Sequence, residues 1–157
     1  MELNTRGRYA VMAMADIASR DSEAAIPLSQ ISERQQITVA YLEQLFQQLR
    51  RADLVESARG RSGGYRLSRP PCDITIAEIL AAVEERTRMT RCLVPDGEPC
   101  LAGERCLTHS LWEALGDEIA AFLGRVTLKD VVAGLPRRRA HTPPVADNVA
   151  TLAGKPA

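Results

Sequence analysis

Residues 38–67, TVAYLEQLFQQLRRADLVESARGRSGGYRL, decide the fold of this chain. Four apolar residues in the first half recur at positions i, i+3, i+4 and i+7, the spacing of one helix face: Leu42, Leu45, Phe46 and Leu49. Thr38 precedes them and is placed to cap the helix. The opposite face is rich in side chains that can hydrogen-bond to base edges: Ala40, Tyr41, Glu43, Gln44, Gln47 and Arg51. The pattern predicts a helix with a buried stripe and a polar outer face.

A basic hairpin is expected directly after this helix. Residues 54–58 predict a short strand, residues 65–67 predict a second one, and the glycine-rich sequence RGRSGG (59–64) forms the turn. This turn lacks the Lys-Ser/Thr ending of a nucleotide-binding loop, and no helix is expected to begin after it. We therefore interpret the hairpin as a wing, with Arg59 and Arg61 placed to reach DNA phosphates or a narrow minor groove.

Two further helices are expected before the polar-faced helix. The first is amphipathic, is preceded by Thr5 and continues to about Ser19. A shorter helix opens at Pro27 and breaks near Gln36. Two short helices joined by a tight turn are the pattern of a helix-turn-helix. Because polar helix faces are most often merely solvated, it is the basic hairpin that favours a winged helix that binds DNA.

The rest of the chain predicts two more helices. Pro70 and Pro71 end the winged module, and Thr75 and Glu78 have the spacing of a capping box that opens the next helix. A last long helix is expected to begin at residue 108 or 109. Its apolar residues recur every three or four positions: Leu111, Trp112, Leu115, Ile119, Phe122, Leu123 and Val126.

This long helix needs a cover for its apolar face. The preceding domain is small and has little spare surface, so we expect the same helix of a second subunit to supply the cover. The contacts are expected to come from Leu111, Leu115, Ile119 and Leu123. The alternative is that the helix folds back on its own domain.

Three of the four cysteines and one of the two histidines lie within eighteen residues: Cys92, Cys100, Cys106 and His109. Their spacing, C-x7-C-x5-C-x2-H, matches neither the paired cysteines of a zinc ribbon nor the cysteine run of a bacterial ferredoxin. Thiolates with an imidazole suit an iron-sulfur or a zinc centre, and the spacing alone fixes neither. The alternative is a surface loop of reactive or disulfide-bonded thiols, with His109 exposed at a helix end. Cys72 is expected to be a semi-buried loop thiol with no assigned role.

Charge is distributed unevenly along a chain whose net charge is zero. Residues 1–71 carry ten basic against eight acidic side chains, whereas residues 72–135 carry six against eleven. Within residues 50–69, six arginines face only Asp53 and Glu56, so a polyanion is expected to bind there. Eighteen of the twenty basic residues are arginine, which suits phosphate and guanine. A compositional bias of the genome explains arginine enrichment equally well, but it does not explain the clustering.

Other classes of protein fit the sequence poorly. No apolar run reaches the length of a membrane-spanning helix. The segment MELNTRGRYA is charged and lacks the apolar core of an export signal, so we expect a cytoplasmic protein, where thiolates bind metals more often than they form disulfides. No catalytic pair is recognisable and only two histidines are present, so we expect no enzyme. Residues 136–157 lack periodicity and predict a disordered tail.

Taken together, these motifs resemble the iron-sulfur cluster assembly regulators of the IscR type, which are winged-helix bacterial repressors. The resemblance covers residues 1–135. It is carried by TRGRYAVMAM (5–14), ISERQQIT (31–38), YLEQLFQQLR (41–50), GGY (63–65), IAEILAAVEE (76–85) and TRCLVPDGEPCLAGERCLTHSLWEAL (90–115). The phrase CLTHSLW, which joins the last cysteine to the long helix, is highly specific for this type of regulator.

The resemblance implies a homodimer that binds a partly palindromic double-stranded operator. It implies a labile 2Fe-2S cluster, with a 4Fe-4S cluster or zinc less expected, whose ligands are Cys92, Cys100, Cys106 and His109. Iron-sulfur assembly scaffold proteins would then be the cluster donors. The residues expected to contact DNA are Thr38, Ala40, Tyr41, Glu43, Gln44, Arg50, Arg59 and Arg61, with Arg59 probing the minor groove.

Two departures from the family pattern affect these expectations. Seven residues separate Cys92 from Cys100, where the closest family members have five. A seven-residue gap also occurs in related regulators that sense nitric oxide or iron, so the cluster type stays open. Ala40 stands where the family regulator carries a serine that hydrogen-bonds to DNA, and the missing hydroxyl removes a hydrogen bond and changes which operators are preferred.

The sequence thus predicts a mainly α protein in five parts. Residues 1–71 are expected to form the winged helix-turn-helix domain, 72–91 a linking helix, 92–106 the cluster-binding loop, 107–135 the dimerisation helix with a short terminal helix, and 136–157 the tail. The expected function is a repressor of iron-sulfur cluster biogenesis genes that senses its 2Fe-2S cluster. The alternatives are a nitric-oxide- or iron-responsive repressor with the same loop, an iron-sulfur electron-transfer or carrier protein that does not bind DNA, and a DNA-binding protein stabilised by zinc.

Overall fold

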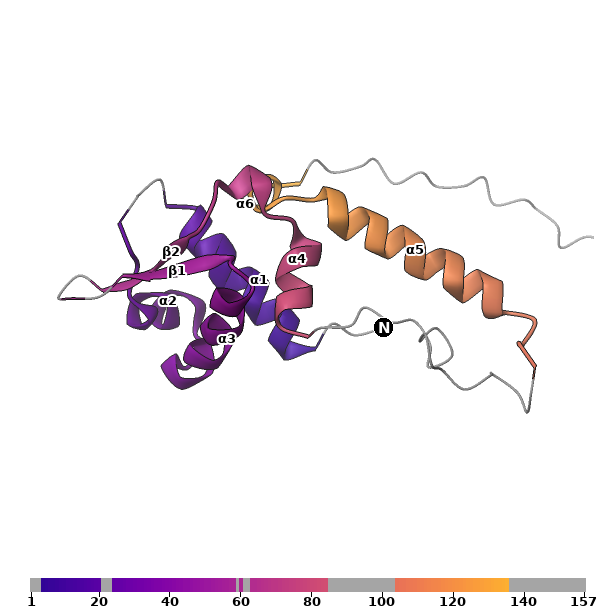
Figure 1. The fold of residues 1–157 in the computed structure, drawn as a ribbon, viewed down its shortest axis with the longest axis horizontal. Coiled ribbons are helices and arrows are strands. Elements are labelled where there is room, and N and C mark those ends of the chain that lie inside the picture. The colour runs from indigo at the N-terminus through magenta and orange to yellow at the C-terminus, as the bar shows by residue number, and fades with distance from the viewer. Residues whose placement is uncertain (1–3, 21–23, 59, 61–62, 85–103, 136–157) are drawn as a thin grey trace, which may run out of the picture.

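The computed structural model describes residues 4–20, 24–58, 60, 63–84 and 104–135. They form a helical domain with a two-stranded hairpin and a long C-terminal helix, which confirms the predicted fold class (Figure 1). The elements in chain order are α1 (Thr5–Ala18), α2 (Leu28–Gln35), α3 (Val39–Arg51), β1 (Val55–Ala58), β2 (Gly64–Leu67), η1 (Pro71–Asp73), α4 (Ile76–Ala82), α5 (His109–Arg125) and α6 (Leu128–Ala133). No helix among the described residues is both long enough and apolar enough to cross a membrane.

Helix α1 includes Thr5, which the sequence pattern placed just before the helix, and Asn4 supplies the cap. The side chain of Asn4 accepts hydrogen bonds from the backbone N–H groups of Arg6 and Gly7, at 2.8 and 3.2 Å. Two alanines on the buried side of α1, Ala10 and Ala13, are fully inaccessible to solvent. Their small side chains let the neighbouring helices approach α1 closely, so α1 forms the centre of the core.

The core is built from the apolar faces that the sequence predicts for α3 and α4. The four stripe residues of α3 are buried, as are Ile76, Ile79, Leu80 and Val83 of the α4 segment. The predicted capping box of α4 is present, because the side chains of Thr75 and Glu78 each bind the other residue's backbone N–H. Val126 and Leu128, from the ends of α5 and α6, complete the same core. The described residues therefore share one hydrophobic core.

The wing is an antiparallel pair in which Val55 faces Leu67 and Ala58 faces Gly64. Tyr65 also pairs with Ile26 through two backbone hydrogen bonds of 2.8 and 2.9 Å, so the segment before α2 forms a minimal third strand. This pairing requires glycine at position 64, where a Cβ atom would lie 2.4 Å from the Ile26 carbonyl. The base of the wing is thus fixed to the helix-turn-helix.

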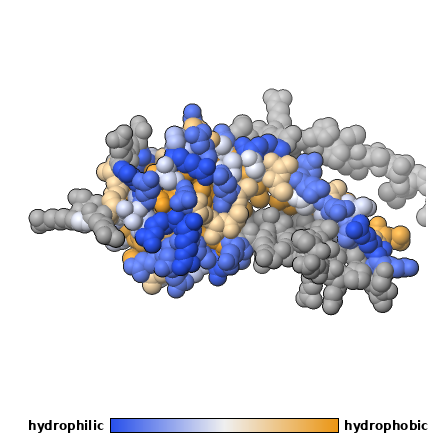
Figure 2. Space-filling model, in the orientation of Figure 1, coloured by the Kyte–Doolittle hydropathy of each residue, from blue (hydrophilic) through white to orange (hydrophobic). Residues whose placement is uncertain are grey.

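Helix α5 is joined to the domain at its C-terminal end. The N–H of Ile76 bonds to the carbonyl of Val126, and the N–H of Leu128 bonds to the carbonyl of Ile74, both at 2.9 Å. From that junction α5 extends away from the winged helix (Figure 1). Figure 2 shows hydrophobic side chains at its distant end, where Leu107 is fully exposed and Leu111 is 58% exposed.

Candidate nucleic-acid interface and metal-ligand segment

Helix α3 presents most of the predicted DNA-contacting residues to solvent. Thr38 precedes the helix, and its hydroxyl accepts a 3.4 Å hydrogen bond from the N–H of Tyr41. Five of the predicted residues are exposed: Thr38, Ala40, Glu43, Gln44 and Arg50. Because the apolar stripe holds the opposite side of α3 in the core, this outward face is fixed relative to the domain. Exposure of this kind is what contact with a DNA groove requires.

Tyr41 differs from the other residues of this set. It is half-buried, because its ring packs edge-on against the ring of Tyr9 in α1, with centroids 5.9 Å apart and planes at 88°. The sequence pattern placed Tyr41 on the outer face but gave no sign of this contact, since the two residues are far apart in the chain. The tyrosine pair joins the N-terminal parts of α1 and α3.

A buried ion pair fixes α2 against α1. The carboxylate of Asp16, only 4% exposed, accepts hydrogen bonds from Arg34 Nε and Nη2 at 3.0 and 2.6 Å, and from Gln35 Nε2 at 3.0 Å. Arg20 lies 3.9 Å from the same carboxylate. Just beyond Gln35, Gln36 adopts a left-handed conformation with φ of 55° and ends α2. The cluster therefore holds the helix-turn-helix at its turn.

The pKa of Asp16 reports the balance of forces in this cluster. Burial alone raises the pKa, but hydrogen bonds from Arg34 and Gln35, together with the charges of Arg34 and Arg20, lower it more. The net result is a pKa below the ordinary value, so the carboxyl group is ionised at neutral pH. Sequence reasoning missed this cluster. The available signal was an aspartate that follows the apolar stretch YAVMAMA inside a predicted helix.

The wing is held to α3 by aromatic packing. The rings of Phe46 and Tyr65 lie 4.8 Å apart, so β2 rests on the buried side of α3. On the strands, Arg66 forms a 2.8 Å ion pair with Glu56, directly across the hairpin. Arg59 and Arg61, predicted to contact DNA, lie outside the described residues, and their role stays a prediction.

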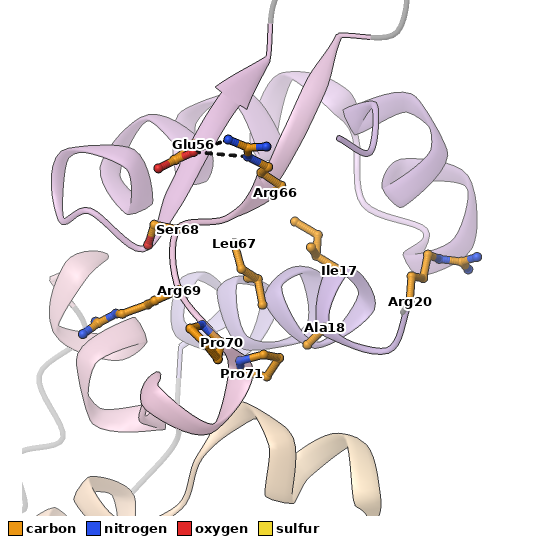
Figure 3. A pocket seen from close by; sticks show the side chains of 10 residues that line it. All are labelled: Ile17, Ala18, Arg20, Glu56, Arg66, Leu67, Ser68, Arg69, Pro70 and Pro71. Carbon is orange, nitrogen blue, oxygen red and sulfur yellow. Dashed lines mark hydrogen bonds and ion pairs between the residues drawn. The ribbon is translucent and has the colours of Figure 1, made fainter. Parts of the chain in front are cut away.

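A groove runs between the end of α1 and the segment after β2 (Figure 3). Its lining includes three arginines, Arg20, Arg66 and Arg69, which Figure 3 shows around the rim. Each is close to a carboxylate: Arg20 to Asp16 at 3.9 Å, Arg66 to Glu56 at 2.8 Å, and Arg69 to Glu78 at 2.7 Å. Of these pairs only Arg69–Glu78 lowers the positive excess predicted for residues 50–69, because that excess already includes Glu56 and Arg20 lies outside the range.

Two of the four predicted metal ligands are described, and both lie where α5 begins. The N–H of His109 bonds to the carbonyl of Cys106 at 3.0 Å, which forms a tight turn before the helix. His109 is 7% exposed, so the alternative of an exposed helix end is wrong. The sulfur of Cys106 lies 3.5 Å from the hydroxyl of Thr108, which makes no side-chain capping bond to the helix.

The other predicted ligands, Cys92 and Cys100, lie outside the described residues. Within the described parts of the chain, no three potential ligands gather into a metal site, so the four-ligand set is not tested there. The two described donors fit a soft metal centre, because a thiol and a shielded imidazole are held three residues apart on one turn. Cys72 was predicted to be semi-buried, but it is exposed in η1, where its sulfur lies 3.5 Å from the carboxylate of Asp73.

The predicted dimerisation face divides into two parts. Leu111 and Leu115 are 58% and 39% exposed, whereas Ile119 is half-buried. Leu123, also half-buried, packs against the core of its own domain. Among the described residues, the alternative that the helix folds back is thus realised at its C-terminal end, and the exposed leucines lie further from the domain. The linking helix predicted over residues 72–91 is α4, which ends at Ala82; residues 85–91 lie outside the described residues.

The chain is similar over most of its length to known transcription regulators. The Rrf2 family model, described as an iron-dependent transcriptional regulator, matches residues 3–134. The HTH-type transcriptional regulator IscR of Xenorhabdus nematophila is 48% identical over 132 residues, which are 84% of this chain and 79% of that protein.

Two solved structures are similar in fold and sequence. IscR of T. potens has a TM-score of 0.69 and 35% identity, and the match covers 85% of this chain and 87% of that one. CymR, the global cysteine regulator of B. subtilis, has a TM-score of 0.70 and 31% identity, with 85% and 97% covered. Both support the winged helix and its long terminal helix as a shared architecture. The chain belongs to the Rrf2 family of iron-dependent transcriptional regulators and is itself a helix-turn-helix transcription regulator.

Proposed function

We propose that the protein is a homodimeric, cytoplasmic repressor of iron-sulfur cluster biogenesis genes that responds to a bound 2Fe-2S cluster. It is a regulator and not an enzyme. The observation that carries the proposal is the turn at the start of α5, where the Cys106 thiol and the buried His109 imidazole lie three residues apart. The chain that carries this turn belongs to a family of DNA-binding regulators.

The DNA-binding part of the proposal rests on α3 and the wing. The exposed residues Glu43 and Gln44 can enter the major groove, where glutamate accepts from cytosine and glutamine pairs with adenine. Ala40 offers only a methyl contact. Thr38, Tyr41 and Arg50 flank this face, and Arg59 and Arg61 on the wing are proposed to reach the backbone or the minor groove.

The cluster would be held by Cys92, Cys100, Cys106 and His109. When bound, it supplies a redox-sensitive centre that can be lost when iron is scarce or oxidants are present. A neutral imidazole binds iron less strongly than a thiolate and can be protonated, so His109 is proposed to make the centre labile. Its burial supports a ligand that is shielded from bulk water.

A second copy of the chain is the proposed cover for α5. The exposed leucines 111 and 115, with Ile119 beside them, give an apolar face that one chain leaves open to solvent. A symmetric dimer would pair two such faces and present two α3 helices to the half-sites of a palindrome. Iron-sulfur assembly scaffold proteins are the proposed cluster donors.

The test uses protein purified without oxygen. Its visible absorption, iron and acid-labile sulfide are measured, followed by binding to a duplex selected from a random-sequence library. We expect a coloured protein with two irons and two sulfides per chain. Alanine at Cys92, Cys100 or Cys106 should give colourless protein that still dimerises, and His109→Cys should give a cluster that survives longer in air.

The outcomes separate the alternatives. Colourless protein with stoichiometric zinc would contradict the iron-sulfur proposal, and coloured protein that binds no duplex would favour a carrier or electron-transfer role. If His109→Cys and His109→Ala both retain the wild-type spectrum and decay rate, histidine is not a ligand, and Cys72 becomes the next candidate. The seven-residue gap between Cys92 and Cys100 favours one other candidate, a nitric-oxide- or iron-responsive repressor. For that candidate, the cluster should react with nitric oxide faster than it reacts with oxygen.

A further inference from the structure

The arginines of the winged helix fall into two groups. Among residues 4–84 that the structure describes, four arginines lie within 4.0 Å of a carboxylate: Arg20, Arg34, Arg66 and Arg69. Four others form no ion pair with a described residue: Arg6, Arg8, Arg50 and Arg51. The paired arginines surround the groove of Figure 3 and the turn after α2. The unpaired ones lie on the first turn of α1 and the last turn of α3.

The N-terminal part of α1 lies beside the first turn of α3. Tyr9 and Tyr41 are in edge-to-face contact with ring centroids 5.9 Å apart. The guanidinium of Arg8 lies 5.5 Å from the centroid of the Tyr9 ring, within the range of a cation-π contact. Arg6 and Arg8 are both exposed. The start of α1, which carries these two cations, is therefore held next to the end of α3 that carries Thr38 and Ala40.

The dimensions of the DNA major groove determine which phosphates lie near the start of α1. A recognition helix lies in a major groove about 12 Å wide, so the phosphates at the groove edge lie about 6 Å from its axis. A helix packed against it has its own axis about 8–10 Å away. Long side chains on the adjoining turn of that second helix therefore reach the backbone strand that borders the groove.

We propose that Arg6 and Arg8 bind the phosphate backbone beside the groove that α3 enters, with the Tyr9–Tyr41 pair fixing their position. This rests on the proposed insertion of α3 and adds the start of α1 to the DNA interface. Their guanidinium groups donate to phosphate oxygens and read no bases. The contact raises affinity for every sequence and anchors the orientation in which the side chains of α3 meet base edges.

The test compares full-length variants on two duplexes: one selected by the wild-type protein from a random-sequence library, and an unselected duplex of the same length. Binding is measured over a range of salt concentrations. Arg6→Ala/Arg8→Ala should weaken binding to both duplexes by a similar factor. The slope of log K against log salt should fall in magnitude by about 0.9 for each phosphate that the variant no longer neutralises. Arg6→Lys/Arg8→Lys should restore most of that slope, because lysine also binds phosphate as a point charge.

A matched control removes the same charge elsewhere. Arg125→Ala/Lys129→Ala takes two exposed cations from α5 and α6, and the salt slope should stay at its wild-type value. If Arg6→Ala/Arg8→Ala keeps the affinity and slope of a wild-type protein that binds DNA, the start of α1 does not touch the backbone and the inference is overturned. If the wild-type protein selects no duplex, the proposed function itself fails, and the inference fails with it.

Discussion

The buried cluster around Asp16 predicts an asymmetry between its two partners. Asp16 is 4% exposed and Arg34 is 26% exposed. Arg34→Ala leaves a carboxylate in the core without its main cation, whereas Asp16→Ala leaves a guanidinium that can regain water. Removing one partner of a buried pair costs about 3–5 kcal/mol when the remaining charge is buried. We therefore expect about 3–5 kcal/mol for Arg34→Ala and about 1.5–3 kcal/mol for Asp16→Ala, the value for losing hydrogen bonds to a charged group.

The dependence of stability on pH should also differ between the wild type and Arg34→Ala. In the wild type the pKa of Asp16 is lowered, so its contribution is complete above the unfolded value of about 3.9 and is lost as the pH falls below it. In Arg34→Ala the pKa of Asp16 should be higher than in the wild type, because the largest lowering contribution is gone and only Gln35 and Arg20 still oppose burial. That variant should therefore lose less stability than the wild type as the pH falls below about 4.

Urea unfolding at fixed protein concentration measures both effects. The free energy of unfolding is obtained at several pH values for the wild type, the two single variants and Asp16→Ala/Arg34→Ala. The double variant should be less destabilised than the sum of the singles, because it leaves no charge without a partner. A coupling energy near zero, or a cost for Asp16→Ala at least equal to that of Arg34→Ala, would refute the reasoning and mean that water screens the pair.

Four further predictions test other parts of the structure. Gly64→Ala should destabilise the protein by about 1–3 kcal/mol, because the new Cβ would lie 2.4 Å from the Ile26 carbonyl. In Gly124→Ala the new Cβ meets no atom within 4 Å, so this change should stabilise α5 by about 0.5–1 kcal/mol. Thermal unfolding of both variants shows whether the two changes in stability have opposite signs. Leu115→Asp/Ile119→Asp should give monomers in sedimentation that bind operator weakly, and a surviving dimer would place the subunit contact elsewhere. Glu43→Ala should broaden the set of duplexes bound, and an equal loss of affinity on all duplexes would exclude a role in site choice. Thr108→Val removes the hydroxyl 3.5 Å from the Cys106 sulfur and should lower the reduction potential of a bound cluster, while Thr108→Ser should leave it near the wild-type value.

The sequence determined most of the local structure. The apolar stripe of α3, the cap at Thr38 and the capping box at Thr75 are confirmed because each depends on residues within one or two helical turns. The wing followed from a glycine-rich turn between two short strands. The family also followed from sequence, since its motifs extend along most of the chain and the comparisons confirm it.

The tertiary structure decided which side chains meet across large sequence separations. Nothing in the sequence paired Tyr9 with Tyr41, Asp16 with Arg34, or Arg69 with Glu78. These pairs depend on the angles at which helices pack, and side-chain periodicity does not specify those angles. The same holds for charge: a surplus of arginine over residues 50–69 is visible in the sequence, but only packing showed which guanidinium groups already have a carboxylate beside them.

The site divides in the same way. The sequence identified His109 as a candidate ligand and left a solvent-facing position open as the alternative, and it assigned Cys72 a semi-buried position; in the structure His109 is buried and Cys72 is exposed. The burial of a residue at the end of a helix depends on which parts of the fold pack against that end, and a local sequence pattern does not predict this packing. The sequence by itself therefore determined the elements, the family and the candidate donors, whereas the tertiary structure decided the exposure, pairing and orientation of their side chains.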